Sequence, residues 1–193
     1  MNDIENALRD LDRSPPSALQ DDTTYSAGAT DHAVLTDSPV GAVWVSWSVR
    51  GLTAVSPRFH SENIDDFMNL HRRFVTESTK LPDDLVDGVV SGLEEGETVG
   101  LPIDFRGIPE FQQSVLATCA TIPLGVVRPY GWIAGEIRNP GSVRAVGTAL
   151  GRNPIPLLIP CHRVVKSDGS VGSYAYGPEM KHQLLVREGA ILT

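Results

Sequence analysis

A run of apolar residues interrupted by prolines places the strongest constraint on how this chain can fold. In residues 154–165, PIPLLIPCHRVV, three prolines separate isoleucine and leucine residues and precede Cys161, His162 and Arg163. Proline lacks a backbone N–H and fixes φ, so we expect the segment to depart from a regular strand. Its apolar residues favour a buried position, and the fixed backbone is what a preorganised site would require.

Cys161 has three possible roles: a nucleophile, a metal ligand or a buried core residue. A free thiol has a pKa of about 8.5, so a nucleophilic cysteine needs a base or a positive charge nearby, and His162 and Arg163 are candidates. Neighbours on a regular strand point to opposite faces, so Cys161 and His162 could meet only at a turn or through a bridging water. The chain has 2 cysteines, and one cysteine beside one histidine falls short of a four-ligand metal site. Local residues leave nucleophile and core cysteine evenly matched.

The first half of the chain contains the pattern of a small antiparallel sheet. Residues 43–49, VWVSWSV, have the two-residue period of a strand, and a turn at residues 50–51 leads into a second strand. Trp44 and Trp47 fall on opposite faces, which predicts partial cover on both sides of the sheet. Residues 97–105 can add a strand at a sheet edge, because that segment contains a proline.

Two helices are predicted in the same half. Residues 64–75 carry apolar side chains at three- and four-residue spacing, and His71 on that face is interpreted as a packed residue rather than a ligand. A second helix covers residues 83–93. Residues 1–34 are rich in Ser, Thr, Asp, Pro and Ala without an apolar period, and we expect a flexible acidic leader there. After this leader, the strands and helices of residues 35–105 predict an N-terminal α/β domain.

Residues 106–193 have the pattern of a mainly helical domain. Pro109 opens a helix whose apolar side includes Cys119, which is interpreted as a core residue. Two short helices follow, joined by a tight Asn-Pro-Gly turn at residues 139–141, and indicate a helix-turn-helix. The predicted fold class is therefore α/β (α+β), with a winged-helix-like helix-turn-helix in the C-terminal domain that also carries Cys161.

Arg144 is the only long charged side chain on the second helix of this pair. Its companions are small or short: Ser142, Ala145, Gly147 and Thr148. A helix that reads the major groove usually projects several Arg, Asn, Gln or Lys side chains. The small side chains of this helix permit close approach to a narrow surface such as the minor groove, or tight packing against another helix. The spacing of the residues does not decide between these two interpretations.

Charge is unevenly distributed along the chain. The net charge is −8, but residues 1–100 hold 18 acidic and 7 basic side chains, a net of −11, whereas residues 101–193 hold 6 and 9, a net of +3. The second half can therefore face phosphates. No stretch approaches the roughly 20 apolar residues of a membrane helix, and the N-terminus lacks the pattern of a secretory signal. We expect a cytoplasmic protein with no membrane partner.

Three segments together resemble a known family. NPIPLLIPCHRVV at residues 153–165, GSVRAVGTAL at residues 141–150 and MKHQLLVREG at residues 180–189 are similar to the active-site region of the O6-alkylguanine-DNA alkyltransferases. The resemblance covers residues 104–190 closely. The part before it is similar mainly in layout, and residues 1–34 have no counterpart.

The resemblance implies repair of DNA by direct damage reversal. The alkyl group of O6-alkylguanine, or that of O4-alkylthymine, would be transferred irreversibly to Cys161, once per protein molecule. His162 would remove the thiol proton through a water molecule, and Glu188 would orient His162. Tyr130 would help to rotate the nucleotide and would donate a proton toward the departing guanine.

It also implies that the damaged nucleotide leaves the duplex, because an alkyl group on O6 is shielded within the base stack. Arg144 would take the place of the extruded base, on a helix surface that approaches the DNA. The residues implied in holding the substrate are Asn153, which would brace the turn before the cysteine, Val164, Tyr174, Ala175 and Tyr176.

Two departures from the family pattern stand out. Tyr176 occupies a usual glycine position, so its ring could narrow the pocket or stack on an adduct. Pro129 stands where a serine is common. No cofactor and no metal are expected, and the expected partner is double-stranded DNA containing O6-alkylguanine, bound by a monomer. Two alternatives are a non-catalytic alkyltransferase-like damage sensor, in which the cysteine is replaced, and a small-molecule thiol hydrolase, which would turn over repeatedly.

Overall fold

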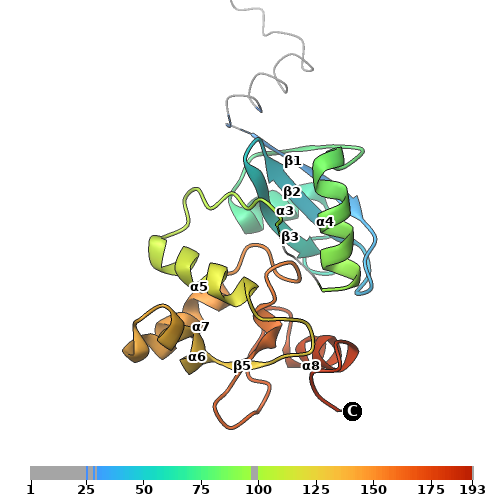
Figure 1. Ribbon diagram of the computed structural model, residues 1–193. Helices are drawn as coiled ribbons and strands as arrows, with labels where there is room; N and C mark the ends of the chain where they lie inside the picture. Colours follow the sequence, from blue (N-terminus) through green and yellow to red (C-terminus); the bar gives the residue numbers. More distant parts are fainter. Residues whose placement is uncertain (1–24, 26–27, 29, 97–99, 193) are drawn as a thin grey trace, which may run out of the picture.

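The computed structural model describes Tyr25, Gly28 and residues 30–96 and 100–192 (Figure 1). Most of the predicted leader, residues 1–34, lies outside the described residues. Its last part was assigned wrongly, because residues 31–34 belong to the first strand and Ala33 there is fully buried. This strand follows a polar stretch and is ordered by pairing with its neighbours, which local composition does not reveal.

Four strands form one sheet in the N-terminal half (Figure 1). They are β1 (Asp31–Thr36), β2 (Val43–Ser48), β3 (Gly51–Pro57) and β4 (Val75–Glu77), in the order β3-β2-β1-β4. The three long strands pair antiparallel, which confirms the predicted strand, turn and strand around residues 50–51. β4 pairs with β1 in parallel, so the sheet is mixed at this edge.

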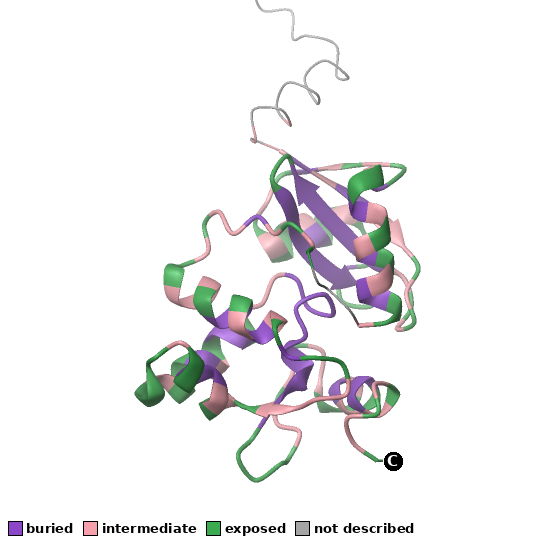
Figure 2. Ribbon diagram, viewed as in Figure 1, coloured by how far each residue is buried: buried purple, intermediate pink, exposed green. Residues whose placement is uncertain are grey.

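The two tryptophans of β2 lie on opposite faces of the sheet, as predicted. Trp44 belongs to a small buried cluster with Phe67 of α3 (Ile64–His71). Trp47 belongs to the main core, together with Leu85 of α4 (Asp83–Glu94). The helices therefore cover the two faces, and every residue of β2 and β3 is buried, as the colouring of Figure 2 shows.

Two predicted elements of this half end differently in the structure. The helix predicted over residues 64–75 stops at His71, because Arg72 adopts a left-handed conformation with φ 52° and Val75 enters β4. The strand predicted over residues 97–105 is, in its described part, reduced to a single bridge between Ile103 and Leu52.

Four helices organise the described part of the C-terminal half: α5 (Glu110–Ala120), α6 (Tyr130–Glu136), α7 (Val143–Gly151) and α8 (Pro178–Arg187). A 3₁₀ turn, η1 (Pro140–Ser142), joins α6 to α7 and confirms the predicted helix-turn-helix. The described strands here, β5 (Arg128–Pro129) and β6 (Val164–Val165), form a short parallel pair, so the winged-helix detail stays a prediction.

The larger core cluster runs across the boundary predicted near residue 106. It joins Val45 of β2 to Leu116 of α5 and to Leu158 of the proline-rich segment. Cys119 is fully buried in this cluster, as predicted. The division into domains over residues 35–105 and 106–193 stays a prediction. In the described part of the chain, no helix has both the length and the apolar character needed to cross a membrane.

Candidate active site around Cys161

The proline-rich segment is buried and irregular, as its sequence predicts. Residues 155–165 are buried throughout, Leu157 has a positive φ of 74°, and Cys161–Arg163 form the short 3₁₀ helix η2. A 3₁₀ turn has three residues per turn, so successive side chains point in clearly different directions. Cys161 and His162 therefore face different surroundings.

Asn153 ties this segment to the end of α7. Its side-chain Nδ2 donates to the backbone oxygen of Ile159 at 3.0 Å and to Sγ of Cys161 at 3.2 Å. Its Oδ1 accepts a hydrogen bond from the backbone N–H of Ile155 at 3.0 Å. One amide side chain thus holds both the loop and the sulfur in position.

The thiol of Cys161 is protonated at rest. Burial raises its pKa, and the hydrogen bond from Asn153 and the charge of Lys181 oppose this only in part. Since the thiolate is the reactive form, a chemical role for Cys161 requires a base that removes its proton at the moment of attack.

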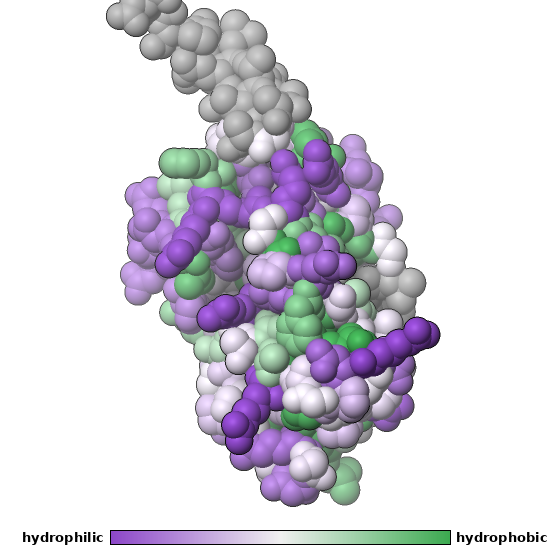
Figure 3. All heavy atoms as spheres, turned by 90° about the vertical axis from the view of Figure 1, so that its left-hand side faces the viewer, coloured by the Kyte–Doolittle hydropathy of each residue, from purple (hydrophilic) through white to green (hydrophobic). Residues whose placement is uncertain are grey.

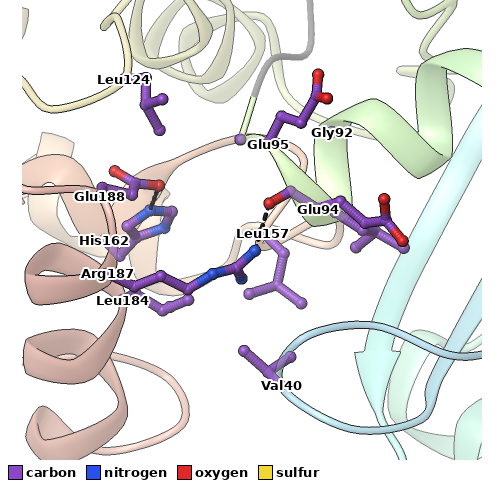
Figure 4. Close-up of a pocket in the computed structure, with 12 residues that line it drawn as sticks. Val40, Gly92, Glu94, Glu95, Leu124, Leu157, His162, Leu184, Arg187 and Glu188 are labelled. Carbon is purple, nitrogen blue, oxygen red and sulfur yellow. Dashed lines mark hydrogen bonds and ion pairs between the residues drawn. The ribbon is translucent and has the colours of Figure 1, made fainter.

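Glu188, the residue after α8, brings the side chains of η2 together. Its Oε1 lies 2.8 Å from Nε2 of His162, and its Oε2 accepts from Nε of Arg163 at 2.8 Å. Figure 4 shows Glu188 and His162 side by side, while Arg187 extends to the backbone oxygen of Glu94. The sequence-predicted pair of His162 and Glu188 is in direct contact.

Charge in this cluster favours a neutral His162 beside an ionised Glu188. Burial disfavours the charged carboxylate, but the hydrogen bonds from His162 and Arg163 outweigh it and lower the pKa of Glu188 to about 2. Burial lowers the pKa of His162, against the opposing effect of Glu188. With Nε2–H donating to the carboxylate, Nδ1 carries the lone pair, and this buried atom has no hydrogen-bond partner among the described residues. His162 is therefore equipped to accept a proton at Nδ1.

A cavity of about 200 Å³ opens onto Cys161. Its walls come from the start of α6, from α7 and from the loop before α8. The lining residues are Tyr130, Gly147, Leu150, Gly151, Cys161, Ser173, Tyr174 and Ala175. Burial raises the pKa of both Tyr130 and Tyr174, so both phenols are protonated donors at neutral pH. Two phenol donors and the sulfur of Cys161 therefore line one cavity.

Comparison with known proteins identifies the family of the chain. The family model "6-O-methylguanine DNA methyltransferase, DNA binding domain" matches residues 110–190. A methylated-DNA–protein-cysteine methyltransferase of Shigella flexneri is 36% identical over 163 residues, which cover 80% of this chain and 94% of that protein. The chain belongs to this methyltransferase family.

Solved structures of family members share the fold. A Mycobacterium tuberculosis OGT in complex with DNA aligns with a TM-score of 0.67 and 32% identity, over 82% of this chain and 93% of that one. An O6-methylguanine-DNA methyltransferase of Pyrococcus kodakaraensis aligns with a TM-score of 0.57 and 29% identity, over 83% and 99%. The likeness therefore extends over both halves of the molecule.

The residues predicted to face DNA lie together, apart from Gly147, which lines the cavity. Arg144, Ala145 and Thr148 are exposed on α7, and Ser142 precedes it in η1. Figure 3 views the molecule from the side of α5, α6 and α7, where a few strongly hydrophilic side chains project from a paler surface. This methyltransferase thus presents α7 next to its cavity.

Two residues predicted to touch substrate do not line the cavity. Val164 is fully buried in β6, so only its backbone is placed near Cys161. Tyr176 points to the N-terminal half and packs against Phe59 and His60, instead of forming the pocket lip. Packing across the chain decides the direction of this ring, which spacing alone does not reveal.

Two buried cations have contacts that the sequence did not predict: Arg163, a candidate positive charge for Cys161, pairs with Glu188 instead, and Lys181 was not singled out. Arg163 donates to the backbone oxygens of Ile122 and Gly96 at 2.7 Å each, in addition to Glu188. Lys181 of α8 is fully buried, and its Nζ donates to the backbone oxygen of Val164 at 2.6 Å. Burial lowers the pKa of Lys181 to about 8. The signal was available, because Lys181 stands four residues before the buried Leu185 and so shares its face of the helix.

Proposed function

We propose that this protein repairs DNA by transferring the alkyl group of O6-alkylguanine to Sγ of Cys161. One observation carries the proposal: a buried thiol faces a cavity lined by two tyrosines, next to a His162–Glu188 pair, in a member of the methyltransferase family. The damage is reversed directly, and the guanine stays in the DNA.

The reaction follows from the protonation states of the site. Sγ attacks the alkyl carbon, the bond from that carbon to O6 breaks, and its electron pair stays on the guanine. His162 takes up the thiol proton at Nδ1 through a water molecule, with Glu188 stabilising the imidazolium. The guanine anion takes a proton from the Tyr130 hydroxyl, and the proton gained by His162 restores Tyr130 through solvent. A thioether remains on Cys161, so each molecule acts once.

The duplex must open for this reaction. Cys161 is only 7% exposed at the bottom of its cavity, and O6 of a paired guanine is stacked within the helix. The nucleotide therefore rotates into the cavity, between Tyr130 and Tyr174. Arg144, exposed on α7, fills the vacated position in the stack. Double-stranded DNA is the partner, O6-alkylguanine is the lesion, and one protein molecule acts on each lesion.

The test is to incubate the protein with a duplex containing O6-methylguanine and to measure the mass of the whole protein and of its peptides. We expect one methyl group on the peptide with Cys161, none in Cys161→Ser, and unchanged transfer in Cys119→Ala, the matched control. Binding without a mass change would indicate a damage sensor. Repeated turnover of a small substrate with indifference to DNA would indicate a thiol hydrolase, and either result would contradict the proposal.

A further inference from the structure

Arg138 closes α6 in a backbone conformation that is unusual for arginine. Its φ of 56° lies in the left-handed region, where helices commonly end on glycine. The backbone N–H of Arg138 donates to the oxygen of Gly135 at 2.9 Å. That of Asn139 donates to the oxygen of Ala134, also at 2.9 Å. These two bonds form a Schellman motif, so a helix end that favours glycine here carries an arginine.

The side chain of Arg138 contributes no polar contact to the described part of the fold. It is exposed, and no described residue accepts a hydrogen bond or forms an ion pair with its guanidinium. The left-handed conformation costs free energy for any residue with a Cβ atom, because that atom approaches the following carbonyl oxygen. A strained backbone without a compensating contact indicates that the side chain acts on a partner outside the fold.

The turn that carries Arg138 lies on the surface where α6 packs against α7 (Figure 1). Residues 138–141 are all exposed and lead to Arg144, so DNA that receives Arg144 lies next to this turn. At the other end of α6, Tyr130 lines the Cys161 cavity. A helix of 7 residues is about 10 Å long, which equals about three nucleotide steps along a duplex.

We propose that Arg138 is a DNA-binding residue whose guanidinium contacts a phosphate within about three nucleotides of the lesion, at the expense of the stability of the free protein. This role rests on the proposed action of the protein on duplex DNA. A phosphate contact fixes where the duplex lies on α7 without reading its sequence. Stability and DNA affinity therefore oppose each other at this position.

Arg138→Gly separates the two effects, because glycine relieves the strain and removes the charge. We expect the melting temperature to rise by about 2–4 °C. The dissociation constant for a duplex with O6-methylguanine should rise roughly eightfold at about 0.1 M salt. Arg138→Ala keeps the Cβ atom, so it should weaken binding equally without raising the melting temperature. Arg138→Lys keeps the Cβ atom and the charge, and should retain most of the affinity.

Arg72→Gly is the matched control. Arg72 is also exposed and ends α3 in a left-handed conformation, with φ 52°, but it stands in the acidic half of the chain. The melting temperature of Arg72→Gly should rise as in Arg138→Gly, because the same strain is relieved. Its affinity for the duplex should equal that of the unmodified protein.

Duplexes with one neutral methylphosphonate linkage locate the contact. The linkage is placed in turn at each position within about four nucleotides of the lesion. At one position it should weaken binding of the unmodified protein but not of Arg138→Gly, which has already lost the contact. Unchanged affinity in Arg138→Gly, no such position, or no rise in its melting temperature would overturn the proposal. Failure of the unmodified protein to bind the duplex or to accept the methyl group would instead refute the proposed function.

Discussion

At the scale of single residues, the carboxylate of Glu188 holds two buried side chains at once. It accepts hydrogen bonds from Arg163 and is paired with Nε2 of His162. Both partners favour the ionised carboxylate, and the side chain of Glu188 is only 9% exposed. The contacts that orient His162 for the proposed proton transfer therefore also contribute to the stability of the fold.

Glu188→Gln should reveal this contribution as a change in acid stability. The pKa of Glu188 falls from the ordinary 4.5 to about 2 in the folded protein. A carboxyl group whose pKa is lowered on folding stabilises the fold at pH values above its pKa in the unfolded chain. This contribution to the free energy of unfolding, roughly 3 kcal/mol in total, is lost as pH falls from 4.5 toward 2. Urea unfolding at pH 6 and pH 3 should show a smaller decrease in the free energy of unfolding for Glu188→Gln than for the unmodified protein.

Glu179→Gln provides the control for that measurement. Glu179 lies on the same helix, α8, but is exposed, and its side chain accepts a hydrogen bond from Gln183 at 3.1 Å. The decrease in the free energy of unfolding of Glu179→Gln between pH 6 and pH 3 should equal that of the unmodified protein. Equal losses in Glu188→Gln and Glu179→Gln would contradict a stabilising role for the buried cluster.

At the scale of elements, η1 and α7 present one exposed arginine beside the cavity. Arg144→Ala should slow alkyl transfer from duplex DNA about tenfold or more, because a wedge offsets an unstacking cost of a few kcal/mol. Transfer from free O6-benzylguanine base should change little, since no duplex has to open. The measurement is the single-turnover rate constant on both substrates.

Arg152→Ala is the control at the C-terminal end of the same helix, where Arg152 is the exposed residue that follows Gly151. This variant also loses one positive charge, so it should bind the duplex more weakly. At saturating DNA, however, its rate constant for alkyl transfer should not fall as far as that of Arg144→Ala. Equal losses for Arg144→Ala on duplex and free base would argue against the wedge.

The elements also show where local pattern succeeds. The helix predicted over residues 83–93 is α4, because its apolar spacing agrees with burial of Leu85, Val89 and Leu93 against the sheet. The helix predicted over residues 64–75 ends early because the pairing of Val75 with Asp31 competes with helix continuation. A contact between distant residues decided that boundary.

At the scale of the whole molecule, the net charge of −8 conceals a net charge of +3 in residues 101–193, the half that we propose binds DNA. Binding should therefore weaken steeply with salt, since each phosphate neutralised contributes about −0.9 to the slope of log K against log salt concentration. Arg138→Ala, at an exposed position after α6, should reduce this slope by about one. Fluorescence anisotropy of a labelled duplex from low to moderate salt measures the slope.

Arg58→Ala tests whether the effect is confined to the basic half. Arg58 is exposed after β3 in the acidic half, so the slope should stay unchanged although one positive charge is lost. A reduction equal to that of Arg138→Ala would mean that DNA follows both halves of the molecule, contrary to the charge distribution.

The sequence by itself determined the class of fold, the helix-turn-helix and the buried, irregular segment around Cys161. These follow from periodicity, proline chemistry and three separated motifs, all of which are local. Only the tertiary structure decided that Arg163 is a buried cation, that β1 begins at Asp31 and that Tyr176 turns away from the cavity to the N-terminal half. Each of these depends on a partner distant in the chain, because burial and pairing energies come from contacts that no single segment contains.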